Sequence, residues 1–170
     1  MNAPLHHELP TPLLDAAQAR ARIDAQWDGD ILRQLTDYIA IPAKSPVFDP
    51  DWAAHGFIDT VVRHAADWVQ AQKVPGLTLE VVRLPGRTPV IFFEIPSTRA
   101  GSTQTALLYG HLDKQPEFTG WRADLGPWTP KYEDGKLYGR GGADDGYAVY
   151  AAIPAARALK AQGLTPPRIL

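Results

Sequence analysis

A histidine and an aspartate stand two residues apart in Gly110-His111-Leu112-Asp113, directly after an apolar run. Residues two apart on a strand face the same side, so both side chains can enter one pocket. A neutral imidazole can bind Zn²⁺ through one nitrogen while the other donates to a carboxylate, which fixes the tautomer. The pair alone is weak evidence, because chance predicts roughly 0.4 His-x-Asp pairs in such a composition. A solvent-facing strand end is the alternative.

Two adjacent aspartates, Asp144-Asp145, precede a predicted helix in a stretch with four glycines between residues 139 and 146. Acidic residues at a helix N-terminus are favoured by the macrodipole and as caps, which requires no catalytic function. The glycines favour a second interpretation, because so many permissive positions indicate that the backbone passes close to another group. A carboxylate held there can bridge two metal ions roughly 3.5–4 Å apart, as in co-catalytic sites.

The composition excludes several other kinds of site. The 170 residues include no cysteine, which rules out a thiol nucleophile, an iron–sulfur cluster, a disulfide scaffold and a Cys-ligated zinc site. The formal net charge of −2 gives no basic field for nucleic acid or an anionic membrane. No P-loop, dinucleotide fingerprint or G-x-S-x-G elbow occurs. Without cysteines or a secretory signal at the start, we expect a cytoplasmic protein.

Helical periodicity predicts three helical regions around these residues. The first covers residues 13–39 and is predicted to break near Asp28-Gly29-Asp30, where Asp30 can cap a second helix. The second is an amphipathic helix over residues 57–74. The third runs from Asp145 to Gln162 and contains Pro154, which is expected to kink it.

A period of two predicts strands at residues 77–84 and 90–95, and a continuous apolar run predicts a strand buried on both faces at 105–109. Asp134-Gly135 predicts a type I′ hairpin turn. A strand, a long loop, a helix and the triplet Arg168-Ile169-Leu170 follow the order of a βαβ unit whose returning strand has just begun. The predicted fold class is therefore α/β, and we expect the natural chain to continue past Leu170. A complete small domain with a frayed last strand is the alternative.

Taken in order, several stretches resemble the co-catalytic zinc metallopeptidases, the family of carnosinase, glutamate carboxypeptidase, acetylornithine deacetylase and succinyl-diaminopimelate desuccinylase. The resemblance runs from about Leu77 to Leu170 and is strongest over residues 107–146. The doubled aspartate and Gly-Lys-Leu-Tyr-Gly-Arg-Gly at residues 135–141 favour its dipeptidase branch. The stretches are Leu107-Leu108-Tyr109-Gly110-His111-Leu112-Asp113, the Trp-containing loop from Trp121 to Pro130, Asp134-Gly135-Lys136-Leu137-Tyr138-Gly139-Arg140-Gly141, and Asp144-Asp145.

This resemblance implies a metal-dependent hydrolase of amide bonds in small peptides or N-acyl amino acids. It implies that His111 ligates one zinc, that Asp113 is the active-site carboxylate that orients His111, and that Asp144 bridges two zincs, with manganese or cobalt as alternative metals. It also implies a cis peptide bond between Asp144 and Asp145. A glutamate general base activates water in this family, while zinc polarises the carbonyl.

Residues 1–12 contain three prolines and no periodic pattern, so we expect them to form a mobile arm. The resemblance further implies that residues 13–170 are the N-terminal part of a zinc-exopeptidase-like catalytic domain with a helix-flanked, mixed and mostly parallel sheet. Gly146-Tyr147 departs from the Lys-Gly that is common in the family, so a role for that lysine is not carried over. The glutamate base, the other metal ligands and a lid domain that can form a homodimer are expected beyond Leu170. Two protein ligands cannot hold two zincs, so the chain alone is expected to be inactive.

One other function fits the residues, and a second fails on its ligand count. A natural short form can act as a non-catalytic module that binds a partner through the sheet edge left open after residue 170, because an apolar edge invites strand pairing. A small stand-alone metal-binding protein has too few ligands unless two chains share a site.

Overall fold

The computed structural model describes residues 14–170. The arm predicted at residues 1–12 lies outside these residues, as does residue 13. The helical elements are α1 (Ala16–Gln26), the π-turn η1 (Trp27–Ile31), α2 (Leu32–Ala40), α3 (Trp52–His55), α4 (Phe57–Ala71), the turn η2 (Gly142–Gly146) and α5 (Tyr147–Ala161). The strands are β1 (Thr78–Val82), β2 (Val90–Glu94), β3 (Thr105–Ala106), β4 (Lys131–Glu133), β5 (Lys136–Tyr138) and β6 (Arg168–Ile169).

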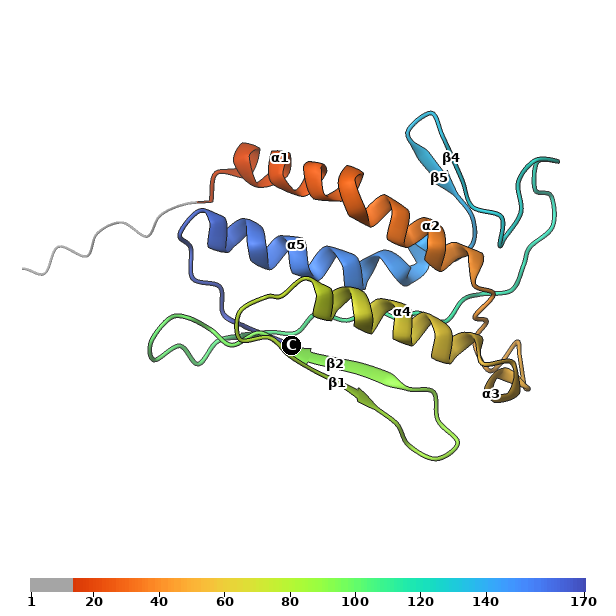
Figure 1. Cartoon of the computed structure of the whole chain (residues 1–170), viewed down its shortest axis with the longest axis horizontal. Helices are drawn as coiled ribbons and strands as arrows, with labels where there is room; N and C mark the ends of the chain where they lie inside the picture. Colours follow the sequence, from red (N-terminus) through yellow and green to blue (C-terminus); the bar gives the residue numbers. More distant parts are fainter. Residues whose placement is uncertain (1–13) are drawn as a thin grey trace, which may run out of the picture.

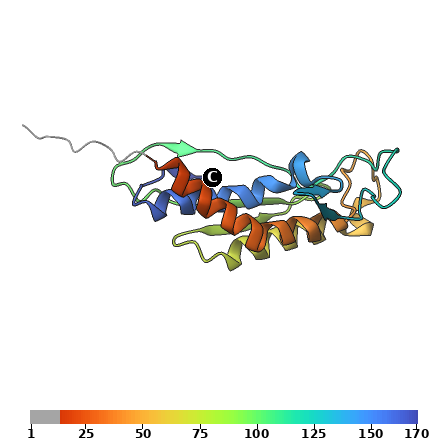
Figure 2. The ribbon, with the colours of Figure 1, turned by 90° about the horizontal axis from the view of Figure 1, so that it is seen from above.

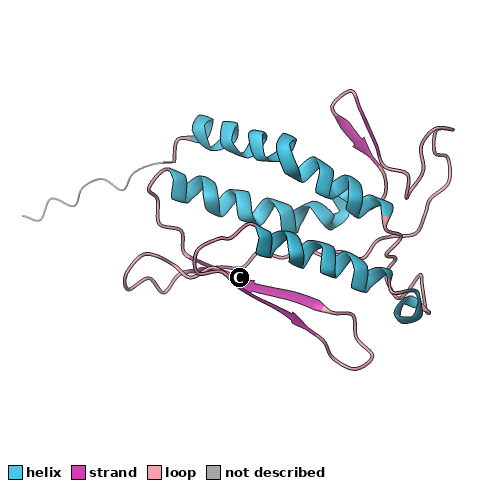
Figure 3. Ribbon diagram, viewed as in Figure 1, coloured by secondary structure: helices cyan, strands magenta, loops and turns pink. Residues whose placement is uncertain are grey.

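The helices form one layer, with strands along its side (Figures 1 and 3). The rod α1–η1–α2 lies beside α5, α5 lies beside α4, and the β1–β2 hairpin packs along α4. Two perpendicular views place α3 and the β4–β5 hairpin at the end of the molecule where α2 ends (Figures 1 and 2). None of the helices in residues 14–170 combines the length and apolar character needed to cross a bilayer.

The strand pairing is mixed. β1 and β2 pair antiparallel, with Leu79 opposite Phe93, whereas β3 and β6 pair parallel, with Ala106 opposite Ile169. Ile95 and Ile169 exchange both backbone hydrogen bonds at 2.9 Å, which joins β6 to the end of β2. The predicted order of strand, long loop, helix and parallel strand is therefore confirmed, and α5 is the crossover helix.

The predicted break near Asp28-Gly29-Asp30 is wrong, because the helix widens there into the π-turn η1 and continues as α2. Asp30 caps no helix; its carboxylate accepts one hydrogen bond from Trp68 Nε1 at 2.7 Å and another from Gln34 Nε2 at 3.1 Å. A π-turn adds one residue to a helical turn. Here it brings Asp30 to the indole of α4, and the first rod is thereby fixed to α4.

We expect Asp30→Ala to lower the free energy of unfolding by about 1–3 kcal/mol, since the indole N–H of Trp68, which is 5% exposed, would lose its acceptor. Urea unfolding measures the change. Asp28→Ala on the same turn removes an exposed carboxylate and serves as the control with little expected effect. Equal losses in the two variants would contradict this role for Asp30.

The core lies where α2, α4, α5 and the end of the sheet meet. It includes buried Ile31, Leu35, Tyr38 and Ile39 of the first rod, Val61, Val62, Trp68 and Val69 of α4, Tyr150, Ile153 and Ala156 of α5, and Ile95 and Ile169 of the sheet. The predicted amphipathic helix at 57–74 is confirmed over Phe57–Ala71, and its apolar face is the buried one. Pro154 lies inside α5 and is buried.

The strand predicted at residues 105–109 is largely wrong, because pairing stops at Ala106 and the rest of the run is exposed. Leu107 is 76% exposed and Tyr109 is 81% exposed. An apolar run is buried on both faces only where neighbouring strands and helices cover it. After β6, in the described residues, only Leu170 lies beside this run, and its main-chain oxygen accepts a hydrogen bond from Leu108 N at 2.8 Å.

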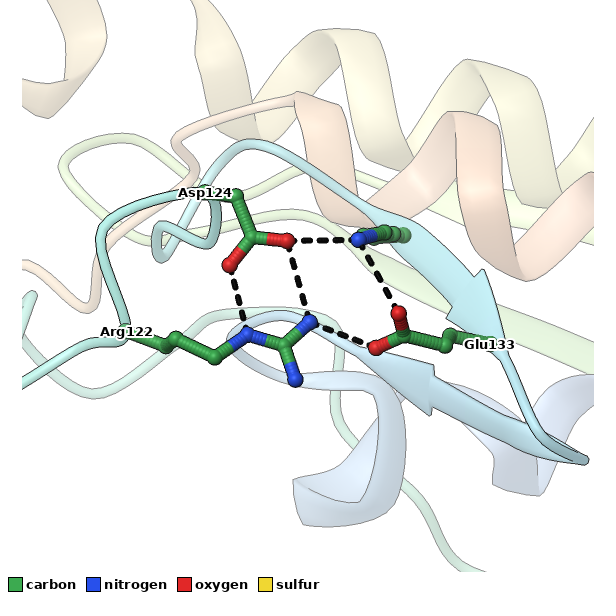
Figure 4. Close-up of polar contacts among 4 residues, drawn as sticks. Arg122, Asp124 and Glu133 are labelled. Atoms are coloured by element: carbon green, nitrogen blue, oxygen red, sulfur yellow. Dashed lines mark hydrogen bonds and ion pairs between the residues drawn. The ribbon is translucent and has the colours of Figure 1, made fainter.

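The predicted hairpin turn at Asp134-Gly135 is confirmed, with φ of 51° at Asp134 and 74° at Gly135 between β4 and β5. A ring of charges fixes this hairpin to the long loop before it (Figure 4). Arg122 donates to both Asp124 and Glu133, and Lys131 donates to the same two carboxylates. These hydrogen bonds hold the pKa of Asp124 well below its usual range. The loop between the two candidate site segments is thereby fixed at its centre.

Candidate metal centre

His111 and Asp144 come from separate segments and meet at one point. His111 lies in the segment after β3, whereas Asp144 lies in η2, just before α5. The distance from His111 Nε2 to Asp144 Oδ1 is 3.2 Å. Two atoms that bind one tetrahedral zinc at about 2.0–2.1 Å lie about 3.3–3.4 Å apart. The structure therefore brings the two predicted ligands to the separation that one metal ion requires.

Asp113 holds the other side of the His111 ring. Nδ1 lies 2.9 Å from the main-chain oxygen of Asp113 and 3.3 Å from its Oδ1. Both neighbours of Nδ1 are acceptors and can receive an Nδ1–H, and the tautomer with its proton on Nδ1 is the one that would leave the lone pair of Nε2 for a metal. Partial burial lowers the pKa of His111, but the Asp113 carbonyl and the charges of Asp113, Asp144 and Asp145 outweigh burial and raise it overall.

The aspartate pair does not cap α5. Its N-cap residue is Gly146, and neither α5 nor η2 has a side-chain cap hydrogen bond. Asp144 is extended, with φ of −131° and ψ of 87°, and its peptide bond to Asp145 is cis, as the resemblance implies. The side chain of Asp144 is 61% exposed, and within the described residues only His111 forms an ion pair with it. The capping interpretation is therefore wrong.

The glycines of residues 139–146 pass close to α2, as their number predicts. A Cβ at Gly139 would overlap the Ile39 side chain, and one at Gly146 would overlap the Tyr38 ring. A Cβ at Gly141 would lie 2.7 Å from Cγ of Lys114. The group that the backbone approaches is the last turn of α2 together with Lys114, and this packing places Asp144 opposite His111.

Gly146→Ala is expected to lower the free energy of unfolding by about 1–3 kcal/mol, because the added methyl overpacks the buried Tyr38 ring. Gly29→Ala is the matched control, since nothing lies within 4 Å of a Cβ at Gly29. In a helix such a change is expected to stabilise by about 0.5–1 kcal/mol. Thermal unfolding of both variants measures the difference, and equal shifts would contradict the close-packing role of Gly146.

The ligand set in the described residues is incomplete. In residues 14–170 no group of three or more His, Asp or Glu side chains lies close enough together to hold a metal ion. A zinc ion takes about four ligands. His111 and Asp144 fit a metal in type and separation, but they supply only part of a coordination shell.

Sequence reasoning did not identify two residues beside this site. Lys114 directly follows Asp113 and is buried, and Tyr38 of α2 donates its hydroxyl to Leu112 O at 3.0 Å. A lysine in a polar, non-periodic loop reads as exposed, so the sequence carries no signal for its burial.

Comparison with known proteins points to one family. Residues 107–170 match the peptidase family M20/M25/M40. The Homo sapiens Beta-Ala-His dipeptidase is 34% identical over 148 residues, which are 82% of this chain and 28% of that protein. The Mus musculus Beta-Ala-His dipeptidase is 40% identical over 75 residues, or 43% of this chain and 14% of that protein.

The solved structures that the chain resembles also include dipeptidases. The crystal structure of human carnosine dipeptidase 1 matches with a TM-score of 0.69 and 30% identity, covering 92% of this chain and 33% of that one. The Saccharomyces cerevisiae di-peptidase Dug1p matches with a TM-score of 0.66 and 23% identity, covering 90% of this chain and 33% of that one, which shows a shared fold. The chain thus spans about a third or less of the length of the relatives that it matches.

Proposed function

Because this chain is related to the dipeptidases of peptidase family M20/M25/M40, we propose that it supplies part of a metal-dependent site that hydrolyses the amide bond of small peptides. The observation that carries the proposal is the separation of 3.2 Å between His111 Nε2 and Asp144 Oδ1. The relatives support peptide hydrolysis in general. The choice of dipeptides, of two zinc ions and of a cytoplasmic location is our proposal.

Each residue has a defined task in this proposal. His111 presents Nε2 to the metal, Asp113 keeps the proton on Nδ1 and fixes the ring, and Asp144 presents Oδ1 beside Nε2. The second oxygen of Asp144, Oδ2, is free to bind a second metal ion, since no residue in 14–170 forms an ion pair with it. A metal bound there would polarise the substrate carbonyl and lower the pKa of water.

The proposed activity belongs to a protein with more ligands than this chain supplies. His111 and Asp144 cannot complete the shells of two metal ions, so we propose that the 170-residue chain alone is inactive. The general base is none of the three residues His111, Asp113 and Asp144. We propose dipeptides or N-acyl amino acids as the substrate class because the chain is similar to dipeptidases. Recognition of one substrate would depend on further residues.

The experiment that tests this function begins with the native protein, isolated from its source with an antibody against residues of this chain. Its intact mass is measured, and its hydrolysis of a dipeptide panel that includes β-Ala-His is followed with Zn²⁺ or Mn²⁺ and after chelation. We expect a mass above 18.6 kDa and hydrolysis that requires metal. A native mass equal to this chain, or hydrolysis that survives chelation, would overturn the proposal.

A groove in the sheet favours one second candidate, the partner-binding module. The groove of about 430 Å³ continues the line of β6, with Val90–Phe93 on one side and Leu107–Gly110 on the other. Ile95 points its N–H and C=O toward β6, so by strand alternation Phe93 and Ile91 point theirs into the groove. We propose as its occupant an extended apolar segment of a second polypeptide, antiparallel to β2 and parallel to residues 107–110.

A soluble apolar peptide flanked by lysines tests this candidate. Fluorescence polarisation should show binding, and hydrogen exchange should show protection of the Phe93, Ile91 and Gly110 amides. The same peptide with alternate amides N-methylated is the matched control, because it keeps the side chains and cannot pair as a strand. Equal binding of both peptides, or of neither, would exclude strand addition.

A further inference from the structure

The last turn of α2 is the point at which both segments of the candidate metal centre are held. Tyr38 donates its hydroxyl to Leu112 O, between His111 and Asp113, at 3.0 Å. The Tyr38 ring also packs directly against Gly146, two residues after Asp144. Tyr38 is fully buried, so its ring and its hydroxyl fix two loops from one position.

Lys114 forms a second connection at the same place. Its side chain is buried, with 1% exposed, and Nζ donates to the main-chain oxygens of Tyr38 at 2.7 Å, Ile39 at 3.3 Å and Ile41 at 2.6 Å. The last carbonyls of a helix have no partner within the helix, and a cation is favoured at that end. The ammonium also lies 4.0 Å from the centre of the Tyr38 ring. Lys114 therefore closes the end of α2.

The backbone and the aliphatic carbons of Lys114 connect the two loops to the C-terminal end of α2. Its backbone N–H donates to Ala43 O at 2.9 Å, and its C=O accepts from Ser45 N at 2.9 Å. Its aliphatic carbons fill the space beside Gly141, three residues before Asp144. In residues 14–170 no carboxylate forms an ion pair with Lys114, although Lys44 beside it pairs with Glu117. Main-chain oxygens and the Tyr38 ring are therefore the groups that face Nζ of Lys114.

We propose that Lys114 and Tyr38 are positioning residues for the metal ligands. Together they fix the segment of His111 and Asp113 and the segment of Asp144 to the same turn of α2, and this sets the separation of Nε2 from Oδ1. Neither residue touches the reacting atoms. The inference rests on the proposed function, because it assumes that His111 and Asp144 receive a metal.

The experiment uses the 170-residue chain with isotopically labelled histidine, and Mn²⁺ as the probe. Paramagnetic broadening of the His111 ring resonances gives the apparent affinity for the metal. Lys114→Met removes the ammonium and keeps most of the stem, whereas Tyr38→Phe removes only the hydroxyl. We expect each variant to weaken Mn²⁺ binding at His111 by about 10–100-fold, the usual effect of losing a group that orients a ligand.

Tyr150→Phe is the matched control. Tyr150 is as buried as Tyr38, but its hydroxyl has no hydrogen-bond partner among the described residues, so its loss should leave Mn²⁺ binding unchanged. The His111 ring resonances without metal are a second readout. They should shift in Lys114→Met and Tyr38→Phe and stay in place in Tyr150→Phe.

The two readouts separate the possible failures. Absence of Mn²⁺ broadening at His111 in the unaltered chain, together with shifted metal-free resonances in the variants, would overturn the assignment of His111 and Asp144 as a metal site in this chain and keep the positioning role. Unchanged affinity and unchanged resonances in both variants would overturn the positioning role, whatever their melting temperatures. Tyr38→Phe decides the question if Lys114→Met does not fold.

Discussion

Replacement of His111 or Asp144 by alanine is expected to lower kcat/KM of the native protein for dipeptides by about 10³-fold or more. Each change removes one ligand of the proposed site, and a bound metal contributes several kcal/mol to stabilising the transition state, where each 1.4 kcal/mol is about tenfold. Asp113→Asn keeps a group beside Nδ1 but weakens the orientation of the ring, so we expect a smaller loss of about 10–100-fold. Steady-state kinetics at saturating metal measures all three.

His55→Ala is the matched control for His111→Ala. The Nδ1 of His55 also faces a carboxylate, that of Asp49 at 2.9 Å, but no second carboxylate forms an ion pair with its ring among the described residues. The change therefore removes a similar histidine–aspartate pair without removing a proposed ligand, and kcat/KM should stay within about twofold. Turnover that is unchanged in both His111→Ala and Asp144→Ala would contradict the assignment of this site.

The sequence contains the local elements of the fold but not the contacts that join them. The face of α4 follows from its apolar spacing, and the β4–β5 turn follows from Asp134-Gly135, because each depends on residues close in the chain. The π-turn at Asp30 does not follow from spacing. The contact that Asp30 makes there, a hydrogen bond from Trp68, joins residues that lie 38 positions apart in the chain.

At the candidate site, too, the sequence predicts the local features but not the contacts between segments. His111, Asp113 and Asp144 can be selected from their types and order, and the glycines before Asp144 signal a close approach. The identity of the approached groups depends on tertiary packing, since Tyr38 and Lys114 come from different segments. The extent of burial at residues 107–109 also cannot be predicted from the sequence, because it depends on which strand lies beside them.

The stability of the chain is expected to rise between pH 7 and pH 9 because of Lys114. Burial lowers the pKa of Lys114 to about 7 from 10.5. In the unfolded chain this lysine has its ordinary pKa of about 10.4. Between these two values the unfolded state holds one more proton than the folded state, so the free energy of unfolding increases with pH. It falls again as the pH returns toward 7, where the folded chain must bury the charged ammonium.

The expected gain from pH 7 to pH 9 is about 2 kcal/mol, since each pH unit with one proton of difference contributes about 1.4 kcal/mol. Urea unfolding at several pH values measures it. Lys114→Met should lack this slope, so the difference between the two curves isolates Lys114 from other titrating groups. The buried tyrosines do not interfere in this range, because burial raises the pKa of Tyr38 and of Tyr150 above that of an ordinary tyrosine. Parallel curves for the two proteins would mean that the three carbonyl oxygens of α2 and Ile41 keep the ammonium charged at pH 9, and a permanent cation would then hold the end of α2 in place.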